Sequence, residues 1–367
     1  MQAERMRSLD GLRGLAVLVV VLGHSAVPHA RHGGGVGVTV FFALSGYLIT
    51  GILLREVRRT GTVRFGGFYA KRALRLAPAL LLLLALLPVL IPYSPGWGSH
   101  YWRNAFAAAG YFANWAQVGG WNLMLLNHTW SLSVEEHFYL LWPALLLLGC
   151  RRLSPRRFAV VVSLGAVVFL AWRVGYYQAG ASSARIYYGT DTNAGALMSG
   201  AAVAAWHQAG VRPRLPGWLP SLAVLGILCA VAMPGRVTSL GAIASQLPAL
   251  VAVGCAALIV AASGQPVRGL TWRPLRYLGA VSYGWYLWHV PLVSLTLYRW
   301  QAVPIPWRGL LASLVALGIA SASYHLFEVR FLALKRHFPS ATREDVPEGE
   351  NAGTAEGAMA QHRITST

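Results

Sequence analysis

The chain has 367 residues, of which 56% are hydrophobic and only 12% are charged. Apolar runs recur along nearly its whole length, a composition that indicates a polytopic membrane protein and excludes an ordinary soluble enzyme. The formal net charge of +19 is carried by basic residues scattered over short loops, so a role in membrane topology is favoured over nucleic-acid binding.

The first apolar segment, residues 11–27, contains a polar pair. Arg13 and His24 are separated by ten residues that are almost all Gly, Ala, Val or Leu. Eleven steps of about 100° place both side chains on one helix face, roughly 16 Å apart along the axis. Ionisable groups within a membrane span usually face a cavity and act there. The alternative is an interfacial anchor at Arg13 and a buried, hydrogen-bonded His24.

The pattern of apolar runs predicts an all-α helical bundle with ten transmembrane helices. The predicted spans are 11–27, 36–54, 75–92, 129–149, 158–177, 191–208, 217–233, 243–262, 277–298 and 308–329. The segment 104–126 is aromatic but interrupted by polar residues, which indicates an interfacial or re-entrant segment. The longest predicted outer loop, about 93–128, carries many aromatic residues, which either stack on sugar rings or lie at the membrane interface.

Basic residues are distributed unequally between the two sides of this predicted bundle. If the N-terminus is cytosolic, most of the 31 basic residues fall on the cytosolic side. The positive-inside rule therefore predicts a multi-pass protein of the cell (inner or plasma) membrane with both termini in the cytosol. One integral-membrane domain, 1–335, is expected to be followed by a disordered cytosolic tail, 336–367, which is polar and rich in Gly, Glu and Thr.

Neither disulfides nor metal sites are predicted. The three cysteines, Cys150, Cys229 and Cys255, lie in spans or at the cytosolic edge and form no framework. The histidines His100, His128 and His207 lack the spacing of metal ligands, so no metal is expected.

The predicted fourth span contains two adjacent carboxylates, Glu135 and Glu136. Two such groups in one apolar span are hard to justify by packing, so a functional role is favoured. The alternative is a structural ion pair with a buried arginine. Asp191 and Glu328, at the ends of predicted spans, are expected to pair with arginine and not to catalyse.

Several motifs follow one another along the chain. They are 8–14 with the Arg13-x10-His24 pair, 41–49, 68–78 with Arg72-x-x-Arg75, 129–139, 283–291 with Tyr-Leu-Trp-His at 286–289, and the late acidic Glu328. This ordered set resembles the membrane acyltransferase-3 family from about residue 7 to 332. Two positions depart from the family pattern: His137 stands where glutamine is usual, and Asn193 where arginine is common. The first substitution is expected to change little, whereas the second removes a positive charge and is expected to affect acceptor choice or activity.

The resemblance implies an acyltransferase that moves an acyl group, commonly acetyl, from acyl-CoA to a hydroxyl. The implied acceptor is a sugar, a surface glycan or a glycosylated natural product, for example of the macrolide type. The implied partners are therefore the acyl-CoA donor, a hydroxyl-bearing carbohydrate or natural product, and the lipid bilayer. No bound cofactor is expected, since acyl-CoA is a substrate.

The residue chemistry agrees with this implication. Acyl transfer to an alcohol needs a base, stabilisation of an oxyanion, and a hold on the donor. His24 is the candidate base because no other residue of the first span titrates near neutrality. Glu135 or Glu136 is expected to orient its ring and stabilise the imidazolium.

The donor is expected to approach from the cytosol. Arg13, Arg72 and Arg75 are candidates to bind its phosphates, since the arginine fork binds phosphate oxygens in pairs, with the pantetheine arm running along the first helix to His24. The alternative for the basic loop at Lys71, Arg72 and Arg75 is topology and lipid headgroup contact.

Three further residues are candidates for substrate binding, each with an alternative. Ser45 is a possible nucleophile, although small residues in spans more often allow close helix packing. Trp130 is expected to shape the acceptor site or to belong to an interfacial belt. His289 either lines the same cavity as His24 or bonds a neighbouring carbonyl.

Two other classes of protein remain alternatives. A proton-coupled transporter also has many spans with embedded Arg, His and Glu, but no pair of similar halves and no matching broken helices are recognisable here. A non-catalytic membrane scaffold would not need the Arg13 and His24 pair.

Overall fold

The computed structural model describes residues 2–25, 30, 33–93, 98–212, 216, 218–232, 241–264 and 267–338. The α-helices are α1 (Gln2–His24), α2 (Gly33–Thr60), α3 (Phe65–Leu86), α4 (Tyr101–Ala109), α5 (Ala113–Val118), α6 (Trp130–Arg152), α7 (Pro155–Gln178), α8 (Ser183–Tyr188), α9 (Thr190–Gln208), α10 (Trp218–Ala232), α11 (Gly241–Gly264), α12 (Arg273–Arg299), α13 (Ile305–Ser323) and α14 (Val329–Ala333). Short turns join them: η1 (Leu87–Tyr93), η2 (Met124–Thr129), η4 (Arg268–Thr271), η5 (Tyr324–Glu328) and η6 (Leu334–His337).

The predicted all-α class is confirmed, since every element within the described ranges is helical. Four stretches of these ranges are long and apolar enough to cross a membrane: Gly33–Thr60, Phe65–Pro92, Pro155–Gln178 and Ile305–His337. A helical membrane protein is therefore supported, while the count of ten spans and the sidedness of the termini stay predictions. The predicted tail lies outside the described residues from position 339 on.

Helix boundaries follow from local chemistry where the sequence provides strong signals. The N-terminus of α7 has Ser154 at the cap, where its hydroxyl accepts from the Arg157 amide, and Pro155 in the first turn. Both are residues that favour a helix start. By contrast, α1 begins at Gln2, well before the apolar run that starts at residue 11. The residues between these two points are mostly good helix formers. The segment 104–126 forms the short helices α4 and α5, of 9 and 6 residues, and the start of η2.

Glycines set the close packing of the central helices. A Cβ on Gly14 would lie 1.9 Å from the Leu275 carbonyl oxygen, and one on Gly279 2.0 Å from that of Asp10. Only residues without a side chain allow α1 and α12 to approach so closely. This contact fixes the register between the two helices that carry His24 and His289.

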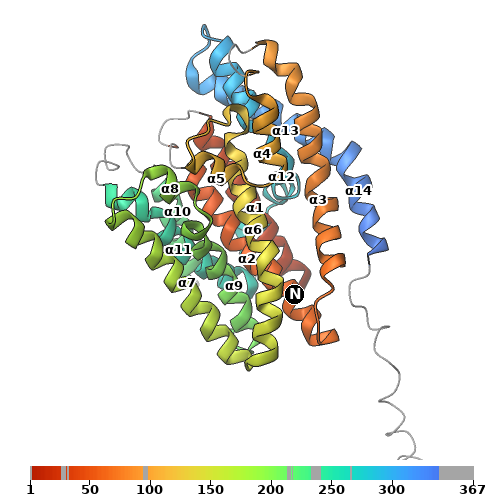
Figure 1. Ribbon diagram of the computed structural model, residues 1–367, viewed down its shortest axis with the longest axis vertical. Coiled ribbons are helices and arrows are strands. Elements are labelled where there is room, and N and C mark those ends of the chain that lie inside the picture. Colours follow the sequence, from red (N-terminus) through yellow and green to blue (C-terminus); the bar gives the residue numbers. More distant parts are fainter. Residues whose placement is uncertain are drawn as a thin grey trace, which may run out of the picture.

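The helices are arranged around this central pair (Figure 1). Figure 1 shows α3 and α14 along one flank and α7, α10 and α11 along the opposite flank, with α1, α2, α6 and α12 between them. The outward face of α7 exposes Val160, Val161, Leu164 and Val167, as expected for a surface in contact with lipid.

Candidate active site

His24 and His289 meet at one end of the α1 and α12 contact. His24 is the last residue of α1, and its exposed ring lies edge-on to that of the fully buried His289, with centroids 5.0 Å apart. His24 Nδ1 is 2.9 Å from the Val20 carbonyl oxygen and 3.4 Å from His289 Nε2. His289 Nδ1 is 2.5 Å from the Tyr286 carbonyl oxygen. The predicted bond of His289 to a neighbouring carbonyl is confirmed, and its ring also contacts His24, while a cavity lined by both histidines stays a prediction.

These contacts assign the tautomers of the histidine pair. Carbonyl oxygens only accept, so Nδ1 of each ring carries its hydrogen and donates to Val20 or Tyr286. His289 Nε2 then holds a lone pair and accepts from His24 Nδ1. His24 Nε2 is left as the unprotonated nitrogen, so it has the lone pair that a general base needs.

A third histidine, His128 of η2, extends this cluster. Its buried ring lies 5.6 Å from the ring of His289 and 5.3 Å from that of Tyr286, whose hydroxyl donates to the His128 carbonyl at 2.5 Å. The described residues hold no group of histidine, cysteine and carboxylate side chains arranged to bind a metal ion. His128 was not predicted to be part of the site, because no spacing rule connects η2 to α12.

The two glutamates of α6 do not take the position predicted for them beside His24. Glu135 Oε1 accepts from the Ser45 hydroxyl at 2.8 Å, and Glu136 Oε1 pairs with Arg72 Nη2 at 2.7 Å. The physical reason is depth along α1. Glu135 lines the same cavity as Arg13, and His24 is eleven residues further along α1, roughly 16 Å away. The prediction that a glutamate orients the His24 ring is corrected, because His289 and the Val20 carbonyl occupy that position.

Arg13 lines an inner cavity of about 100 Å³. The polar side chains of its wall come from five helices, α1, α2, α3, α6 and α12. They are Arg13, Ser45, Arg72, Arg75, Ser131, Glu135, Ser282, Tyr283 and Tyr286. The cavity therefore brings together the predicted residues Arg13, Arg72, Arg75, Ser45 and Glu135. Tyr286 connects it to the histidine cluster.

A larger pocket of about 430 Å³ adjoins this cavity. Its charged lining consists of Arg55, Glu56, Arg59, Arg64, Lys71, Arg72, Arg75 and Lys335. Seven of these eight side chains are basic, and Arg72 and Arg75 line both the pocket and the inner cavity. Lys335 comes from η6, far along the chain, so no local motif identified it.

Two contacts fix the Arg72 side chain between the basic pocket and the inner cavity. Besides its ion pair with Glu136, its guanidinium lies 3.3 Å from the centre of the Tyr139 ring. The side chains of Arg72 and Glu136 are only 15% and 22% exposed. The alternative predicted for the glutamates, an ion pair with a buried arginine, is therefore realised at Glu136, and it positions an arginine of the cavity wall.

Ser45 makes a polar contact in the cavity wall, whereas Trp130 packs in the core. It is Gly46, not Ser45, that allows α2 to approach α9, because a Cβ there would lie 1.8 Å from the Leu197 carbonyl oxygen. Ser45 instead turns its hydroxyl toward Glu135. Trp130 is buried, with its ring 6.0 Å from Phe42 and 4.9 Å from Tyr187, so it belongs to the aromatic core beside the cavity and not to an interfacial belt.

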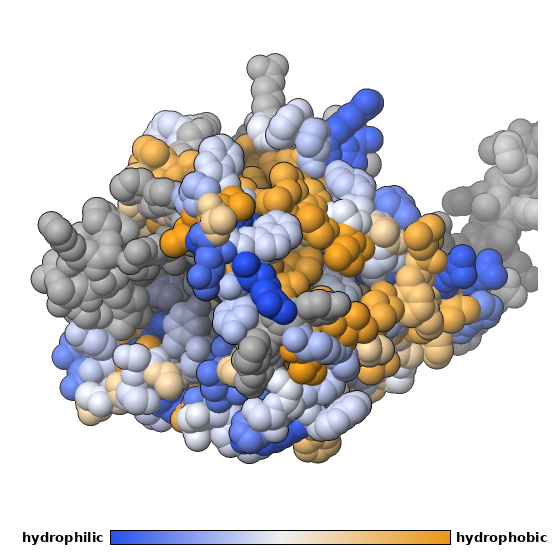
Figure 2. All heavy atoms as spheres, turned by 90° about the horizontal axis from the view of Figure 1, so that it is seen from above, coloured by the Kyte–Doolittle hydropathy of each residue, from blue (hydrophilic) through white to orange (hydrophobic). Residues whose placement is uncertain are grey.

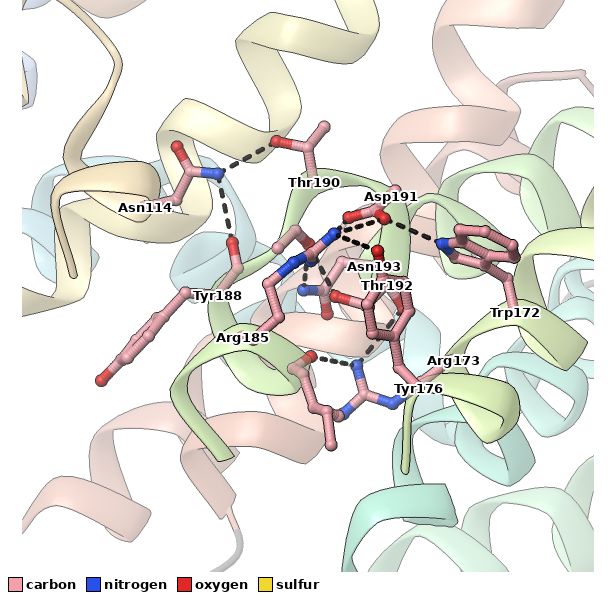
Figure 3. A network of polar contacts seen from close by, with 12 residues as sticks. Asn114, Trp172, Arg173, Tyr176, Arg185, Tyr188, Thr190, Asp191, Thr192 and Asn193 are labelled. Carbon is pink, nitrogen blue, oxygen red and sulfur yellow. Dashed lines mark hydrogen bonds and ion pairs between the residues drawn. The ribbon is translucent and has the colours of Figure 1, made fainter. Parts of the chain in front are cut away.

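Asn193, one of the two departures from the family motifs, lies in a polar network at the start of α9 (Figure 3), and the other, His137 of α6, contacts Thr190 of that network. Asn193 Nδ2 donates to the carbonyls of Tyr187 and Gly189 at 2.9 and 2.8 Å. His137 Nδ1 lies 2.8 Å from the Thr190 hydroxyl. Asn193 thus ties together the turn between α8 and α9.

Two arginines bring positive charge to the same network. Arg185 pairs with Asp191 through contacts of 2.7 and 2.8 Å, and the buried Arg173 donates to the carbonyls of Ile186 and Thr192. The pairing predicted for Asp191 is confirmed. A positive charge is present near position 193 on the buried Arg173 of α7, whereas that of Arg185 is paired with Asp191.

Comparisons with known proteins agree with these motifs. A family model described as an acyltransferase domain matches residues 6–325. The chain is 32% identical over 344 residues to the peptidoglycan O-acetyltransferase OatA of Listeria monocytogenes. It is 33% identical over 345 residues to a putative peptidoglycan O-acetyltransferase, YrhL, of Bacillus subtilis, and 29% identical over 306 residues to the O-acetyltransferase OatA of Staphylococcus aureus.

These alignments differ in how much of each protein they cover. They include 88%, 87% and 78% of this chain, but only 55%, 54% and 50% of the three relatives. The chain therefore spans about half the length of the curated relatives it matches. No solved structure is significantly similar to it.

Proposed function

Because this chain belongs to the acyltransferase-domain family, we propose that it transfers an acyl group, acetyl above all, from acyl-CoA to a hydroxyl of a carbohydrate. The relatives named as peptidoglycan O-acetyltransferases favour a glycan acceptor over a macrolide-type natural product. We place the enzyme in the cell membrane with ten spans, with both termini and the basic pocket on the cytosolic side. The family assignment gives no support to a proton-coupled transporter.

The observation that carries this proposal is the sharing of Arg72 and Arg75 between the basic pocket and the inner cavity. The pocket, with seven basic side chains, suits the phosphates of the CoA nucleotide. The inner cavity, about 100 Å³, is much smaller than the basic pocket, about 430 Å³. The donor is therefore expected to leave its nucleotide in the basic pocket and to extend only its arm inward, past Arg13 toward His24.

The chemistry is assigned to His24. Its Nε2 takes the proton of the acceptor hydroxyl while the oxygen bonds to the thioester carbonyl carbon. The C–S bond then breaks, and the proton passes from His24 to the departing thiolate. The Val20 carbonyl and His289 Nε2 accept from His24 Nδ1 throughout, so they stabilise the imidazolium as an orienting group does in a hydrolase triad.

The donor path is tested with two donors that differ in charge. Acetyl-CoA carries the nucleotide phosphates, whereas S-acetylpantetheine carries the same thioester without them. Arg59→Gln and Lys335→Gln, which change the basic pocket alone, are expected to raise the apparent KM for acetyl-CoA about tenfold each. They should leave the kinetics with S-acetylpantetheine unchanged.

Arg58→Gln is the matched control, because Arg58 is an exposed neighbour that does not line the pocket. The protein is purified in detergent, and label transfer from the acetyl group to a glycan acceptor is measured. Equal effects of the pocket variants on both donors would show that the basic pocket does not bind the nucleotide. Label transfer to no acceptor by the wild-type protein would refute the enzyme activity itself.

A further inference from the structure

The acidic residues of the chain are unevenly distributed. Five of the twelve follow position 338, and four of these five fall within residues 344–350, as Glu344, Asp345, Glu348 and Glu350. This acidic segment contains no basic residue, and it lies outside the described residues. Four carboxylates in seven positions repel one another, and a cluster of cations is the partner that relieves this repulsion.

The basic pocket provides a cluster of this kind. Seven of its eight charged lining side chains are basic, and the acidic one, Glu56, already accepts a hydrogen bond from the Arg64 amide at 3.2 Å. Glu136, which pairs with Arg72, compensates one further positive charge. Within the described part of the chain, the pocket therefore keeps a large excess of positive charge.

The basic pocket also has an apolar part. Ile49, Ile52 and Phe68 lie in its lining beside the basic side chains. The acidic segment combines the same two properties, since Val346 and Pro347 stand between its two pairs of carboxylates. Opposite charges and apolar groups thus occur together in the pocket and in the segment. Complementarity of this kind favours one partner over other anions.

The chain itself holds the acidic segment near the pocket. Lys335 of η6 lines the pocket, and Glu344 follows nine positions later. Nine residues span at most about 30 Å when fully extended, so Glu344 stays close to the pocket in any conformation. A ligand on so short a tether has an effective concentration of about millimolar, and a few weak ion pairs are then enough to hold it.

The pocket and the start of the segment lie at the same end of the bundle (Figure 1). Here α14 packs beside α3 and leads into η6, and α3 and η6 contribute Lys71 and Lys335 to the pocket. Figure 2 shows the other end of the molecule, seen from above, where hydrophilic residues are interspersed with apolar ones. The chain therefore continues from the basic end of the bundle directly into the acidic segment.

We propose that the acidic segment 344–350 binds in the basic pocket and competes there with the phosphates of the donor nucleotide. The competition rests on the proposed function, whereas the binding of the segment does not. A competing segment raises the apparent KM for acyl-CoA and leaves turnover at saturating donor unchanged. The enzyme is thereby restrained when acyl-CoA is scarce, and the restraint is lifted when acyl-CoA is abundant.

Binding is tested by cross-linking, because Lys71 and Lys335 are the two lysines of the chain and both line the pocket. A water-soluble carbodiimide joins a carboxylate to a lysine that it contacts. Lys71 is the informative lysine, since it belongs to α3, whereas Lys335 is close to the segment along the chain. We expect peptide mapping of the purified full-length protein to find Lys71 joined to the segment 344–350, in a yield that added salt reduces.

Variants assign this cross-link to the pocket. Lys71→Arg keeps the charge but has no amine to couple, so it should remove the cross-link. Arg59→Gln, which removes one cation of the lining, should lower the cross-link yield at Lys71 about twofold to fivefold. Arg58→Gln is the matched control, because Arg58 is exposed beside Arg59 but does not line the pocket, and its yield should equal that of the wild type.

Competition is tested with a neutral segment. The variant with Glu344→Gln, Asp345→Asn, Glu348→Gln and Glu350→Gln should lower the KM for acetyl-CoA about threefold to tenfold at unchanged turnover. Its kinetics with S-acetylpantetheine, which lacks the nucleotide phosphates, should match those of the wild type. The control variant exchanges Glu and Asp at the same four positions, which keeps the charge, and should show the wild-type KM for both donors.

The outcomes separate this inference from the proposed function. Absence of the Lys71 cross-link, both in detergent and in vesicles that contain phosphatidylglycerol, would overturn the binding of the segment even if acyl transfer is observed. An unchanged KM in the neutral variant would overturn the competition. A Lys71 cross-link that depends on Arg59 would uphold the binding even if no acyl transfer is found. Displacement of that cross-link by adenosine 3′,5′-bisphosphate would further support a shared site.

Discussion

The two ends of the polar stripe on α1 lie in contrasting surroundings. Arg13 lines a cavity whose wall includes Arg72, Arg75 and Glu135, and which continues into a pocket with seven basic side chains. His24 instead contacts neutral groups, the Val20 carbonyl and the ring of His289. Charge suits the binding of an anionic donor, whereas a neutral partner leaves His24 Nε2 free to act as a base. Under the proposed function, the same helix separates donor binding from chemistry.

The largest expected effect concerns the chemical end of this stripe. His24→Ala should lower acyl transfer by roughly two to four orders of magnitude, the usual contribution of a positioned base. The KM for acetyl-CoA should change little, because the proton moves only in the transition state. Turnover and KM are measured with labelled acetyl-CoA, and His325→Ala, an exposed histidine elsewhere, is the control. Retention of more than about a tenth of the activity would remove His24 from the mechanism.

The second prediction concerns the binding end. Arg13→Ala should raise the KM for acetyl-CoA by about tenfold to a hundredfold, as for the loss of one charge-assisted contact, with a smaller change in turnover. Arg13→Lys should recover part of the loss, because lysine keeps the charge but not the paired donors. Arg7→Ala, an exposed position on the same helix, serves as the control. A loss of turnover as large as that of His24→Ala, at unchanged KM, would place Arg13 in the catalytic centre.

A third prediction compares the two candidates for the group that orients His24. His289→Leu should lower turnover about tenfold to a hundredfold at unchanged donor KM, since it removes one of the two acceptors for His24 Nδ1 and leaves only the Val20 carbonyl. His289→Gln should restore part of that turnover, because its side-chain oxygen accepts a hydrogen bond. Glu135→Gln should act mainly on donor KM, because Glu135 lines the inner cavity, where the donor arm is proposed to bind. The opposite pattern would return the orienting role to the glutamate.

The last prediction concerns the sidedness of the protein, and the two cysteine variants that test it are expected to change activity least. In a variant without its native cysteines, Ser154→Cys, between α6 and α7, should react with a membrane-impermeant thiol reagent only after the membrane is permeabilised. Ser99→Cys, just before α4, should react in intact cells. The reverse pattern would place the basic pocket outside and contradict a cytosolic donor.

The sequence predicted the site residues that lie in motifs better than those that join the site from other parts of the chain. Arg13, Arg72 and Arg75 were expected to act together, and all three line one cavity. Lys335 and His128 were missed because they join the site from η6 and η2, through contacts between segments far apart in the chain. The partner of His24 was misassigned, since adjacent glutamates in a span suggest function but do not reveal their depth.

The sequence by itself determined the helical class, and it predicted the apolar spans and a shared face for Arg13 and His24, because these follow from composition and the helical period. The tertiary structure decided which groups meet across helices. Gly14 and Gly279 let α1 and α12 pack closely enough to pair His24 with His289, while the offset of α6 sends Glu136 to Arg72. Register between helices depends on the packing of whole surfaces, so no local pattern in the sequence specifies it.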